Sequence, residues 1–458
     1  MKRSFFFQHA FLPGGWRRNV RLESQNGLIV SARADATPEP QDRRERIAVP
    51  GLPNLHSHAF QRAMAGLAER RGPANDNFWS WREAMYRFVR AMGPDEVQAI
   101  AAYAYADMLE AGFTTVGEFH YVHRAPDGEA YADPAELALR HVAAADETGL
   151  GIVMLPVFYA ASTFGGAPPT AGQKRFITGL DAFADIVERA GAAVSGARLG
   201  RGLGVAPHSL RAVPPQLLAP LIEMRPQGPL HIHAAEQVKE VEDCLAWSGL
   251  RPVEWLLEHV GLDPRWCLVH ATHLTQDETL RLAASGAAAG LCPITEGNLG
   301  DGIFPAAAYL EAGGRFGVGT DSNIQLDAAG ELRQLEYSQR LILRARNVLA
   351  PASGASTGQR LLEAALQGGA QALGLGPAGL QPGAPADFVV LEADQTDLAM
   401  VGEEHWLDAW IFALGRRGVD KVAVNGEIVV EGGRHRARDA IDARYRAAIA
   451  ELSTESAP

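Results

Sequence analysis

The chain has 458 residues, of which 47% are hydrophobic and 21% are charged, and its formal net charge is -12. This balance is typical of a globular α/β or similar protein with a sizeable core, and it excludes a largely disordered chain. The negative charge, together with the lack of any run of Lys and Arg, argues against binding to nucleic acids or to anionic membranes.

Cysteine usage and the lengths of the apolar runs indicate the compartment. Cys244, Cys267 and Cys292 lie far apart in the sequence, so a disulfide framework is not expected and a reducing environment is favoured. The apolar run at Phe5–Phe7 is too short for the core of a signal peptide. No apolar run approaches the roughly 18 residues of a spanning helix. We therefore expect a soluble, cytoplasmic protein.

Strand-like segments lie near both ends of the chain, at residues 19–23, 28–32, 385–391 and 421–430. The last of them contains Asn425-Gly426, a dipeptide that is typical of a tight hairpin turn. Neither terminal segment can bury both faces of a sheet by itself. We therefore predict that residues 1–48 and 381–458 combine into one small β-sandwich domain.

Between these ends, residues 49–380 alternate short apolar strands with longer segments of helical period. A strand that begins at Val49 is followed by seven more, at residues 113–119, 151–159, 202–206, 230–233, 267–270, 287–292 and 316–320. A helical period over residues 95–111 fills one of the gaps and ends before Gly112. Eight β-then-α units predict a (β/α)8 TIM barrel with insertions, in which the chemistry lies at the carboxyl ends of the strands.

Polar side chains follow several of these strands at the point where each one ends. His56 and His58 close the first strand, and a spacing of two residues directs both imidazoles to the same side. His233 ends the fifth strand and Asp321 follows the eighth. Three imidazoles and a carboxylate could together hold Zn²⁺ or a similar ion. The alternative is that each residue is an ordinary polar group at the start of a loop, and Fe²⁺ would accept the same donors.

The order of these residues resembles the amidohydrolase superfamily. The matching features are His56-Ser57-His58, His233 with Glu236 three residues later, His270 after the sixth strand, and Asp321. The resemblance extends over essentially the whole chain. It implies a divalent metal, most simply Zn²⁺, that is bound by His56, His58, His233 and Asp321.

Two-metal members of this superfamily bridge their ions with a modified lysine at the end of strand four. Here the corresponding residues are 205–208, Val-Ala-Pro-His, and none of the four lysines in the chain lies there. The resemblance therefore implies one metal per chain, as in the deaminase branch of the superfamily.

The chemistry of the remaining polar residues suits hydrolysis of a carbon–nitrogen double bond. We expect Asp321 to take a proton from the attacking water and His270 to hydrogen-bond the hydroxide or the developing oxyanion. We expect Glu236 to carry the proton to the leaving nitrogen. Hydroxide attack on carbon, protonation of nitrogen and loss of ammonia would follow in that order.

Four longer motifs, at residues 54–66, 118–123, 208–213 and 295–305, resemble the branch of this superfamily that hydrolyses N-formimidoyl-L-glutamate in histidine degradation. Its products are N-formyl-L-glutamate and ammonia. This small substrate carries two carboxylates, which guanidinium groups bind well. We expect Arg82, in the long loop after strand one, and Arg211, after strand four, to bind them, with hydrogen bonds from Gln61, Tyr121 and His208.

Other interpretations remain open. The chain could be another mononuclear deaminase that acts on a guanine-like or triazine-like ring, or a catalytically silent metal-binding scaffold on the same barrel. Residues 78–82 could form a packed lid or a subunit contact. Members of this branch often carry histidine where Asn323 stands, which would affect substrate preference if that position touches substrate. The resemblance also implies a homodimer.

Overall fold

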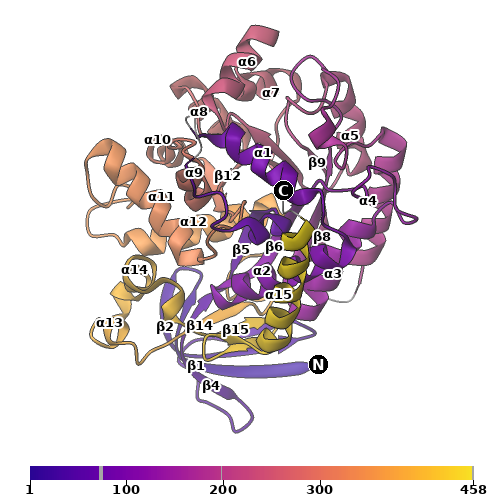
Figure 1. The fold of residues 1–458 in the computed structure, drawn as a ribbon. Coiled ribbons are helices and arrows are strands. Elements are labelled where there is room, and N and C mark those ends of the chain that lie inside the picture. The colour runs from indigo at the N-terminus through magenta and orange to yellow at the C-terminus, as the bar shows by residue number, and fades with distance from the viewer. Residues whose placement is uncertain (72–75, 197–198, 456–458) are drawn as a thin grey trace.

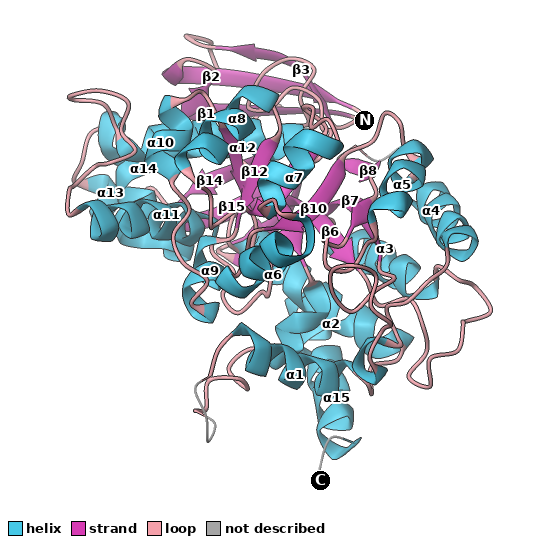
Figure 2. Cartoon of the chain, turned by 90° about the horizontal axis from the view of Figure 1, so that it is seen from above, coloured by secondary structure: helices cyan, strands magenta, loops and turns pink. Residues whose placement is uncertain are grey.

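The structure is a computed structural model that describes residues 1–71, 76–196 and 199–455. A barrel of parallel strands surrounded by helices occupies most of the described chain, and a separate mixed sheet lies beside it (Figure 1). Seen from above, the barrel strands lie at the centre and the helices lie around them (Figure 2). The predicted fold class, a (β/α)8 barrel with a small β-domain built from both termini, is confirmed, and the terminal strands predicted to form a β-sandwich pair in one sheet within the described residues.

The barrel strands form two parallel arcs within the described residues. They are β5 (Leu52–Ser57), β6 (Phe113–His120), β7 (Gly151–Phe158), β8 (Arg201–Leu203), β9 (Ala206–Pro207), β10 (Leu230–Ala234), β11 (Trp266–His270), β12 (Ala288–Leu291) and β13 (Arg315–Val318). β5–β8 make one arc and β10–β13 make the other. Isolated bridges from Val205 to Leu230 and from Ser57 to Asp321 join the arcs and close the barrel. All eight predicted strands are present, the fourth being split into β8 and β9.

Helices cover the outside of the barrel because each presents an apolar face to the strands. The longer ones are α2 (Pro94–Glu110), α3 (Glu136–Thr148), α4 (Leu180–Val194), α5 (Leu218–Met224), α6 (Val238–Ser248), α7 (Pro252–His259), α8 (Gln276–Ser285), α9 (Pro293–Leu299), α10 (Ala306–Glu311), α11 (Ala328–Leu343) and α12 (Thr357–Ala372). α2 matches the predicted helix: it starts at Pro94, and Gly112, just beyond its end, has a φ of +97°.

A helix that was not predicted follows the first barrel strand. α1 (Phe78–Val89) replaces the long loop expected after the first strand. The side chain of Asn77 caps it by accepting hydrogen bonds from the backbone N–H groups of Trp79 and Ser80. Arg82 therefore lies on a helix and not on a loop. The run of aromatic residues that suggested a packed lid is the first turn of α1.

The terminal segments share one eight-stranded sheet in the described chain, with the order β17-β16-β15-β14-β4-β1-β2-β3. Its strands are β1 (Lys2–Leu12), β2 (Gly15–Gln25), β3 (Leu28–Arg33), β4 (Arg43–Pro50), β14 (Phe388–Leu391), β15 (Val419–Val424), β16 (Glu427–Glu431) and β17 (Arg434–His435). β4 pairs with β1 on one side and with β14 on the other, so the two ends of the chain meet in the middle of the sheet. The apolar run Phe5–Phe7 belongs to β1, a central strand that the sequence alone did not predict.

Aromatic rings form the centre of this sheet's core. Phe388 on β14 is fully buried, and its ring makes edge contacts with Phe5 and Phe7, at centroid distances of 4.8 and 5.1 Å. Such contacts add to the stabilisation that burial of a large apolar side chain provides. They join the C-terminal strand to the N-terminal one.

Replacing Phe388 by alanine is expected to lower the free energy of unfolding by about 3 to 5 kcal/mol, because the change leaves a cavity where three rings now pack. Urea unfolding followed by circular dichroism measures this change. Val30→Ala, on β3, is the matched control because Val30 is 52% exposed, and it should leave the unfolding midpoint nearly unchanged. Equal stability of Phe388→Ala and the wild type would contradict the importance assigned to this cluster.

The C-terminal helix α15 (Arg438–Glu455) packs against α2 through a buried ion network. Asp107 of α2 accepts hydrogen bonds from Arg438 at 2.8 Å, from Arg416 at 3.3 Å and from Arg62 at 3.0 Å. Breaking one member of such a network leaves a buried charge without its partner, which is strongly destabilising. The network reaches the barrel because Arg62 also donates to the carbonyl oxygen of Asn323 at 2.9 Å, in the loop that carries Asp321.

Short helices complete the described chain: η1 (Ala59–Met64), η2 (Ala171–Gln173), η3 (Pro215–Leu217), α13 (Thr396–Ala399), η4 (Glu403–His405), α14 (Trp406–Ala409), η5 (Trp410–Leu414) and η6 (Gly415–Gly418). Cys244, Cys267 and Cys292 are all free and buried, as the sequence predicted. Within the described residues, no helix has both the length and the apolar character that a bilayer crossing requires.

Candidate active site

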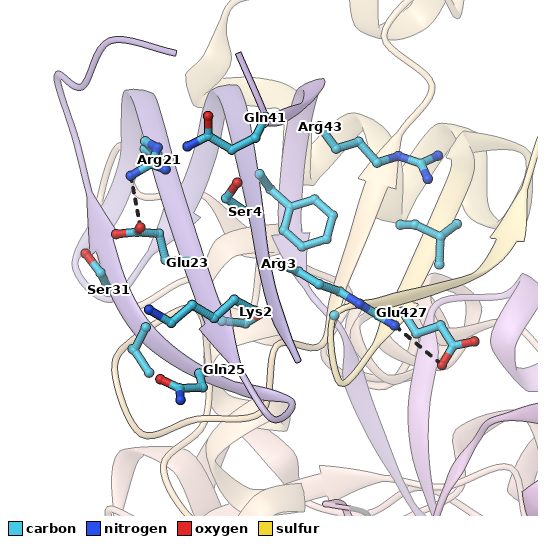
Figure 3. Close-up of a pocket in the computed structure, with 15 residues that line it drawn as sticks. Lys2, Arg3, Ser4, Arg21, Glu23, Gln25, Ser31, Gln41, Arg43 and Glu427 are labelled. Atoms are coloured by element: carbon cyan, nitrogen blue, oxygen red, sulfur yellow. Dashed lines mark ion pairs between the residues drawn. The ribbon is translucent and has the colours of Figure 1, made fainter. Parts of the chain in front are cut away.

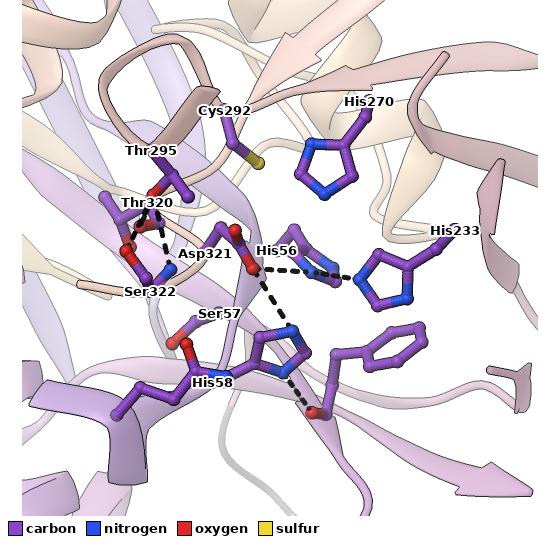
Figure 4. A network of polar contacts seen from close by, with 12 residues as sticks. His56, Ser57, His58, His233, His270, Cys292, Thr295, Thr320, Asp321 and Ser322 are labelled. Atoms are coloured by element: carbon purple, nitrogen blue, oxygen red, sulfur yellow. Dashed lines mark hydrogen bonds and ion pairs between the residues drawn. The ribbon is translucent and has the colours of Figure 1, made fainter. Parts of the chain in front are cut away.

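Four polar side chains from the ends of three strands meet at the carboxyl end of the barrel (Figure 4). His56 lies in β5 and His58 directly after it, His233 lies in β10, and Asp321 follows β13. One potential ligand atom from each lies within 4.8 Å of the others. Nε2 of His56 is 3.2 Å from Nε2 of His233, and Nε2 of His58 is 3.1 Å from Oδ1 of Asp321.

The protonation pattern of this group fits a divalent cation. Nδ1 of His58 donates to the carbonyl oxygen of Phe119 at 2.8 Å, and Nδ1 of His233 donates to the carbonyl oxygen of His208 at 3.0 Å. These bonds leave the lone pairs of both Nε2 atoms facing the centre, as in metal-bound histidines. Burial lowers the pKa of His56 to about 3, so its ring is neutral at pH 7.

Asp321 completes the group as an anion. Burial alone would raise its pKa, but the adjacent imidazoles of His56 and His58 hold the pKa of this carboxyl well below its usual range. Neutral imidazole nitrogens whose lone pairs face one another and a carboxylate have no proton between them with which to form hydrogen bonds. A bound cation would accept all of these lone pairs at once. The four residues predicted as metal ligands therefore lie together in an arrangement that suits a metal.

Backbone strain is concentrated around this group. Residues with a positive φ follow three of the strands: Ala235 (+53°), His270 (+68°), Ala271 (+47°), Asp321 (+43°) and Asn323 (+56°). Non-glycine residues adopt this conformation at a cost of about 1 to 3 kcal/mol each, and such residues cluster at active sites. Glycine is required at position 319 for a different reason: a Cβ there would lie only 2.8 Å from the carbonyl oxygen of His56. Its missing side chain lets the eighth strand end close beside the first.

A cavity lies directly above the four ligands. Its wall consists of His58, Gln61, Phe78, Trp81, Arg82, Met85, Tyr86, Tyr121, Tyr159, Phe176, His208, Arg211, His233, Glu236, His270, Leu299 and Asp321. All five predicted substrate-binding residues and all three predicted catalytic residues belong to this wall. The enclosed volume is about 50 Å³, well below the roughly 300 Å³ at the lower end of ligand pockets. α1 supplies five of these side chains and so forms one wall of the cavity.

Glu236 lies between two positive groups at the side of the cavity. Its Oε2 is 3.6 Å from Nη2 of Arg211, and its Oε1 is 3.8 Å from Nε2 of His270. Burial raises the pKa of Glu236, against the opposing effects of His270 and Arg211. Burial acts to lower the pKa of His270, but Glu236 and Glu296 outweigh it and raise that pKa to about 10. This arrangement allows a proton to be held close to the ligand group.

The two arginines differ in their partners. Arg211 is buried, its guanidinium faces Glu236 and Glu240, and its Nε has no hydrogen-bond partner. Arg82 lies over the rings of Trp79, at 4.5 Å, and of Tyr86, at 5.5 Å. Both therefore present N–H groups in or beside the cavity, where they could bind an anion.

Other predicted residues have more specific surroundings than the sequence indicated. The amide nitrogen of Gln61 donates to the hydroxyl of Tyr121 at 3.0 Å, while Oε1 of Gln61 has no partner. Asn323 is fully buried and does not line the cavity. Its amide donates to Oγ of Ser57 at 3.2 Å and to the carbonyl oxygen of Asp321 at 3.0 Å. Asn323 thus supports the metal-ligand loops and does not face the substrate cavity.

Sequence reasoning missed several residues at the site. Tyr159 directly follows β7, so its position at a strand end was a usable signal, and Tyr86 lies one helical turn after Arg82. Phe176 and Leu299 line the cavity from segments whose sequence carried no such signal. Two buried carboxylates, Glu240 and Glu296, contact the predicted residues from helices.

A larger groove, of about 940 Å³, lies on the outer face of the eight-stranded sheet (Figure 3). Its charged side chains pair with one another: Arg21 is 3.1 Å from Glu23, and Arg3 is 3.9 Å from Glu427. Among the residues that the structure describes, none of the predicted site residues lines this groove. The smaller cavity at the strand ends is the candidate active site.

Comparison with known proteins identifies the family. The model of the amidohydrolase family matches residues 47–429, which include the whole barrel. The chain belongs to the amidohydrolase family. A second model, described as the N-terminal domain of the formimidoylglutamate deiminase HutF, matches residues 3–46 of this amidohydrolase.

Individual relatives agree with this assignment. The amidohydrolase chain is 50% identical to formimidoylglutamate deiminase of Pseudomonas aeruginosa over 94% of its own length and 95% of that protein. It is 29% identical to 8-oxoguanine deaminase of the same organism over 90% of its length and 88% of that protein. A crystal structure of an amidohydrolase from Brucella melitensis is 52% identical, with a TM-score of 0.95, and the match covers 98% of this chain and 100% of that one. A zinc-bound adenosine deaminase from Xanthomonas campestris, 22% identical with a TM-score of 0.82 over 98% of each chain, shares the fold.

Proposed function

We propose that this amidohydrolase is a formimidoylglutamate deiminase, which converts N-formimidoyl-L-glutamate and water to N-formyl-L-glutamate and ammonia in histidine degradation. The observation that carries the proposal is the presence of Arg82 and Arg211 in the same cavity as a four-ligand metal group. A dicarboxylate substrate needs cationic partners in a chain whose net charge is -12. The 50% identity to a protein of that name over 94% of the chain supports it.

We propose that His56, His58, His233 and Asp321 hold one divalent metal ion, most simply Zn²⁺, because three neutral imidazoles and one carboxylate form a typical zinc donor set. When bound, such an ion lowers the pKa of water and polarises the reacting carbon. In the described part of the chain, no second group of close metal-binding side chains occurs. His208, after β9, occupies the cavity wall where two-metal relatives carry their bridging lysine.

The proposed roles of the surrounding residues follow from their positions. Arg82 and Arg211 bind the two carboxylates, and Gln61, Tyr121 and His208 orient the substrate by hydrogen bonds. Asp321 accepts the proton of the attacking water, and His270 hydrogen-bonds the attacking hydroxide or the developing oxyanion. Glu236 then delivers a proton to the nitrogen, so that the carbon–nitrogen bond breaks and ammonia leaves. We further propose that the enzyme works in the cytoplasm as a homodimer.

The relevant alternative is a ring deaminase, since the cavity wall contains Phe78, Trp81 and Phe176, and a curated relative at 29% identity is an 8-oxoguanine deaminase. The ammonia released from N-formimidoyl-L-glutamate and from guanine, measured on one sample of known metal content, separates the two functions. We expect rapid release from the first compound only. Turnover of guanine alone would overturn the proposal.

Removal of the metal from the same sample is expected to abolish ammonia release, because no side chain in the cavity can activate water as strongly. Incubation with a chelator, followed by gel filtration and metal analysis, gives the apoprotein. Addition of about one equivalent of Zn²⁺ should restore activity, and a parallel titration with Fe²⁺ compares the two metals. Full activity in metal-free protein would contradict the metal-dependent chemistry.

A further inference from the structure

A buried carboxylate that the proposed chemistry does not use lies behind His270. Glu296 is on α9, which follows the seventh barrel strand β12, and only 5% of its surface is exposed. Its Oε1 is 3.3 Å from Nδ1 of His270 and also accepts a hydrogen bond from the backbone N–H of Cys292 at 2.9 Å. Figure 4 shows His270 and Cys292 beside the ligand group.

The contact orients the ring of His270 through its Nδ1–H. A carboxylate has no proton to donate, so Nδ1 must be the donor in this pair. Nε2 then points to the other side, where Oε1 of Glu236 lies at 3.8 Å. The ring of His270 also stacks on that of His233, with centroids 5.5 Å apart and an interplanar angle of 16°. A rotation of the ring would break both contacts.

Two further observations indicate that this orientation is held by the structure. His270 has a φ of +68°, so the backbone is strained at the residue that carries the ring. Glu296 is itself fixed, because the backbone N–H of Asp301 donates to its carbonyl oxygen at 3.0 Å and Cys292 holds its carboxylate. The imidazole is thus clamped between a rigid carboxylate and the reacting centre.

We infer that Glu296 is a positioning residue, which fixes the ring of His270 so that Nε2 faces Glu236 and the cavity. This inference rests on the proposed function and deepens it, because it assigns the contact that makes His270 effective. The alternative is a purely structural role, in which Glu296 only satisfies the N–H of Cys292. The two roles predict different kinetics, because only the first acts through His270.

A double-mutant cycle tests the inference. Glu296→Gln keeps an oxygen for the N–H of Cys292, but its amide can also donate to Nδ1 of His270. We expect kcat for ammonia release to fall about 10-fold to 100-fold, with KM within about threefold of the wild type and the metal content unchanged. His270→Ala should lower kcat further. The double variant should match His270→Ala within about twofold, because Glu296 has nothing left to position.

One control variant and two contradicting outcomes complete the double-mutant cycle. Asn298→Ala changes an exposed residue of the same helix, which contacts Glu69, and should leave kcat and KM unchanged. Losses that multiply in the double variant, or a kcat of Glu296→Gln equal to that of the wild type, would overturn the inference. A wild-type enzyme that releases ammonia from guanine alone would reject the proposed function, and the cycle would then be run with that substrate.

A crystal structure of zinc-loaded Glu296→Ala tests the same contact without turnover. We expect the ring of His270 to rotate away from Glu236, while the four ligand side chains remain in place. A ring that keeps its orientation in this variant would overturn the inference whatever the substrate. If Glu296→Ala does not fold, Glu296→Leu, which removes the carboxylate but fills its space, takes its place in the same test.

Discussion

Replacing Glu236 by glutamine is expected to lower kcat for ammonia release by about 10³-fold or more, while one metal ion per chain is retained. Glutamine has the shape of glutamate but cannot accept and return a proton, and a positioned acid–base group contributes about 10² to 10⁴-fold. Glu236 lies beside the ligand group and not in it, so its loss should leave the metal site intact. The burial that raises its pKa suits a group that must hold a proton and then release it.

Steady-state kinetics with a coupled ammonia assay, together with metal analysis of each preparation, check this expectation. Glu242→Gln is the matched control, because Glu242 lies on the same helix, α6, but is exposed to solvent. That variant should behave as the wild type. A Glu236→Gln enzyme with normal kcat would reject the proton-transfer role, and one that loses its metal would show that Glu236 is a ligand.

The same measurement distinguishes the enzyme from a silent scaffold. A scaffold protein on this fold would bind metal but release no ammonia with or without Glu236. A loss of activity that is confined to Glu236→Gln therefore requires both a working site and a proton carrier.

Replacing Arg211 by methionine is expected to lower kcat/KM for N-formimidoyl-L-glutamate by about 10² to 10⁴-fold. A buried charge pair with a substrate carboxylate contributes about 3 to 5 kcal/mol when one partner is removed, which corresponds to that range. The guanidinium of Arg211 is buried and faces carboxylates and aromatic rings. Its positive charge therefore has few other groups with which to pair. Arg211→Lys should recover only part of the loss, because an ammonium cannot form the same paired hydrogen bonds.

Because Arg211 also contacts Glu236, loss of activity in Arg211→Met could come from lost substrate binding or from a displaced Glu236. A second substrate separates these two effects. If Arg211 binds substrate, then a formamidine that lacks carboxylates should be hydrolysed at similar, slow rates by the wild type and by Arg211→Met. If Arg211 acts mainly by placing Glu236, both substrates should lose activity by the same factor. An unchanged kcat/KM for the glutamate derivative would reject the carboxylate-binding role of Arg211. Arg82→Met on α1 tests the second guanidinium in the same assay.

Much of the architecture could be predicted because it depends on local patterns. The barrel strands are short and mostly apolar, several have a polar residue at or just after their carboxyl end, and helix-forming segments separate them. The strand β1 was missed because its apolar residues are consecutive, at Phe5–Phe7, and do not alternate with polar ones. The helix α1 was missed because its aromatic run was interpreted as part of a long loop, although Asn77 is a good N-cap and Phe78, Met85 and Val89 recur at a helical spacing.

The role suggested for Asn323 illustrates the limit of reading one position at a time. The sequence left open whether position 323 touches substrate, and in the structure its side chain bonds to Ser57 and to the backbone of the Asp321 loop. The direction of a side chain in a strained loop depends on φ and ψ, and the φ of +56° at Asn323 is not visible in the sequence.

The sequence by itself determined which residues form the candidate metal site, because strand ends in a closed barrel meet at one edge whatever the details of packing. His56, His58, His233 and Asp321 needed only this topology to be placed together. The tertiary structure alone decided what surrounds them: the helix α1 over the cavity, Glu240 beside Arg211 and Glu296 behind His270. Those contacts join helices and loops whose relative positions come from packing of the whole barrel, and no short-range pattern records them.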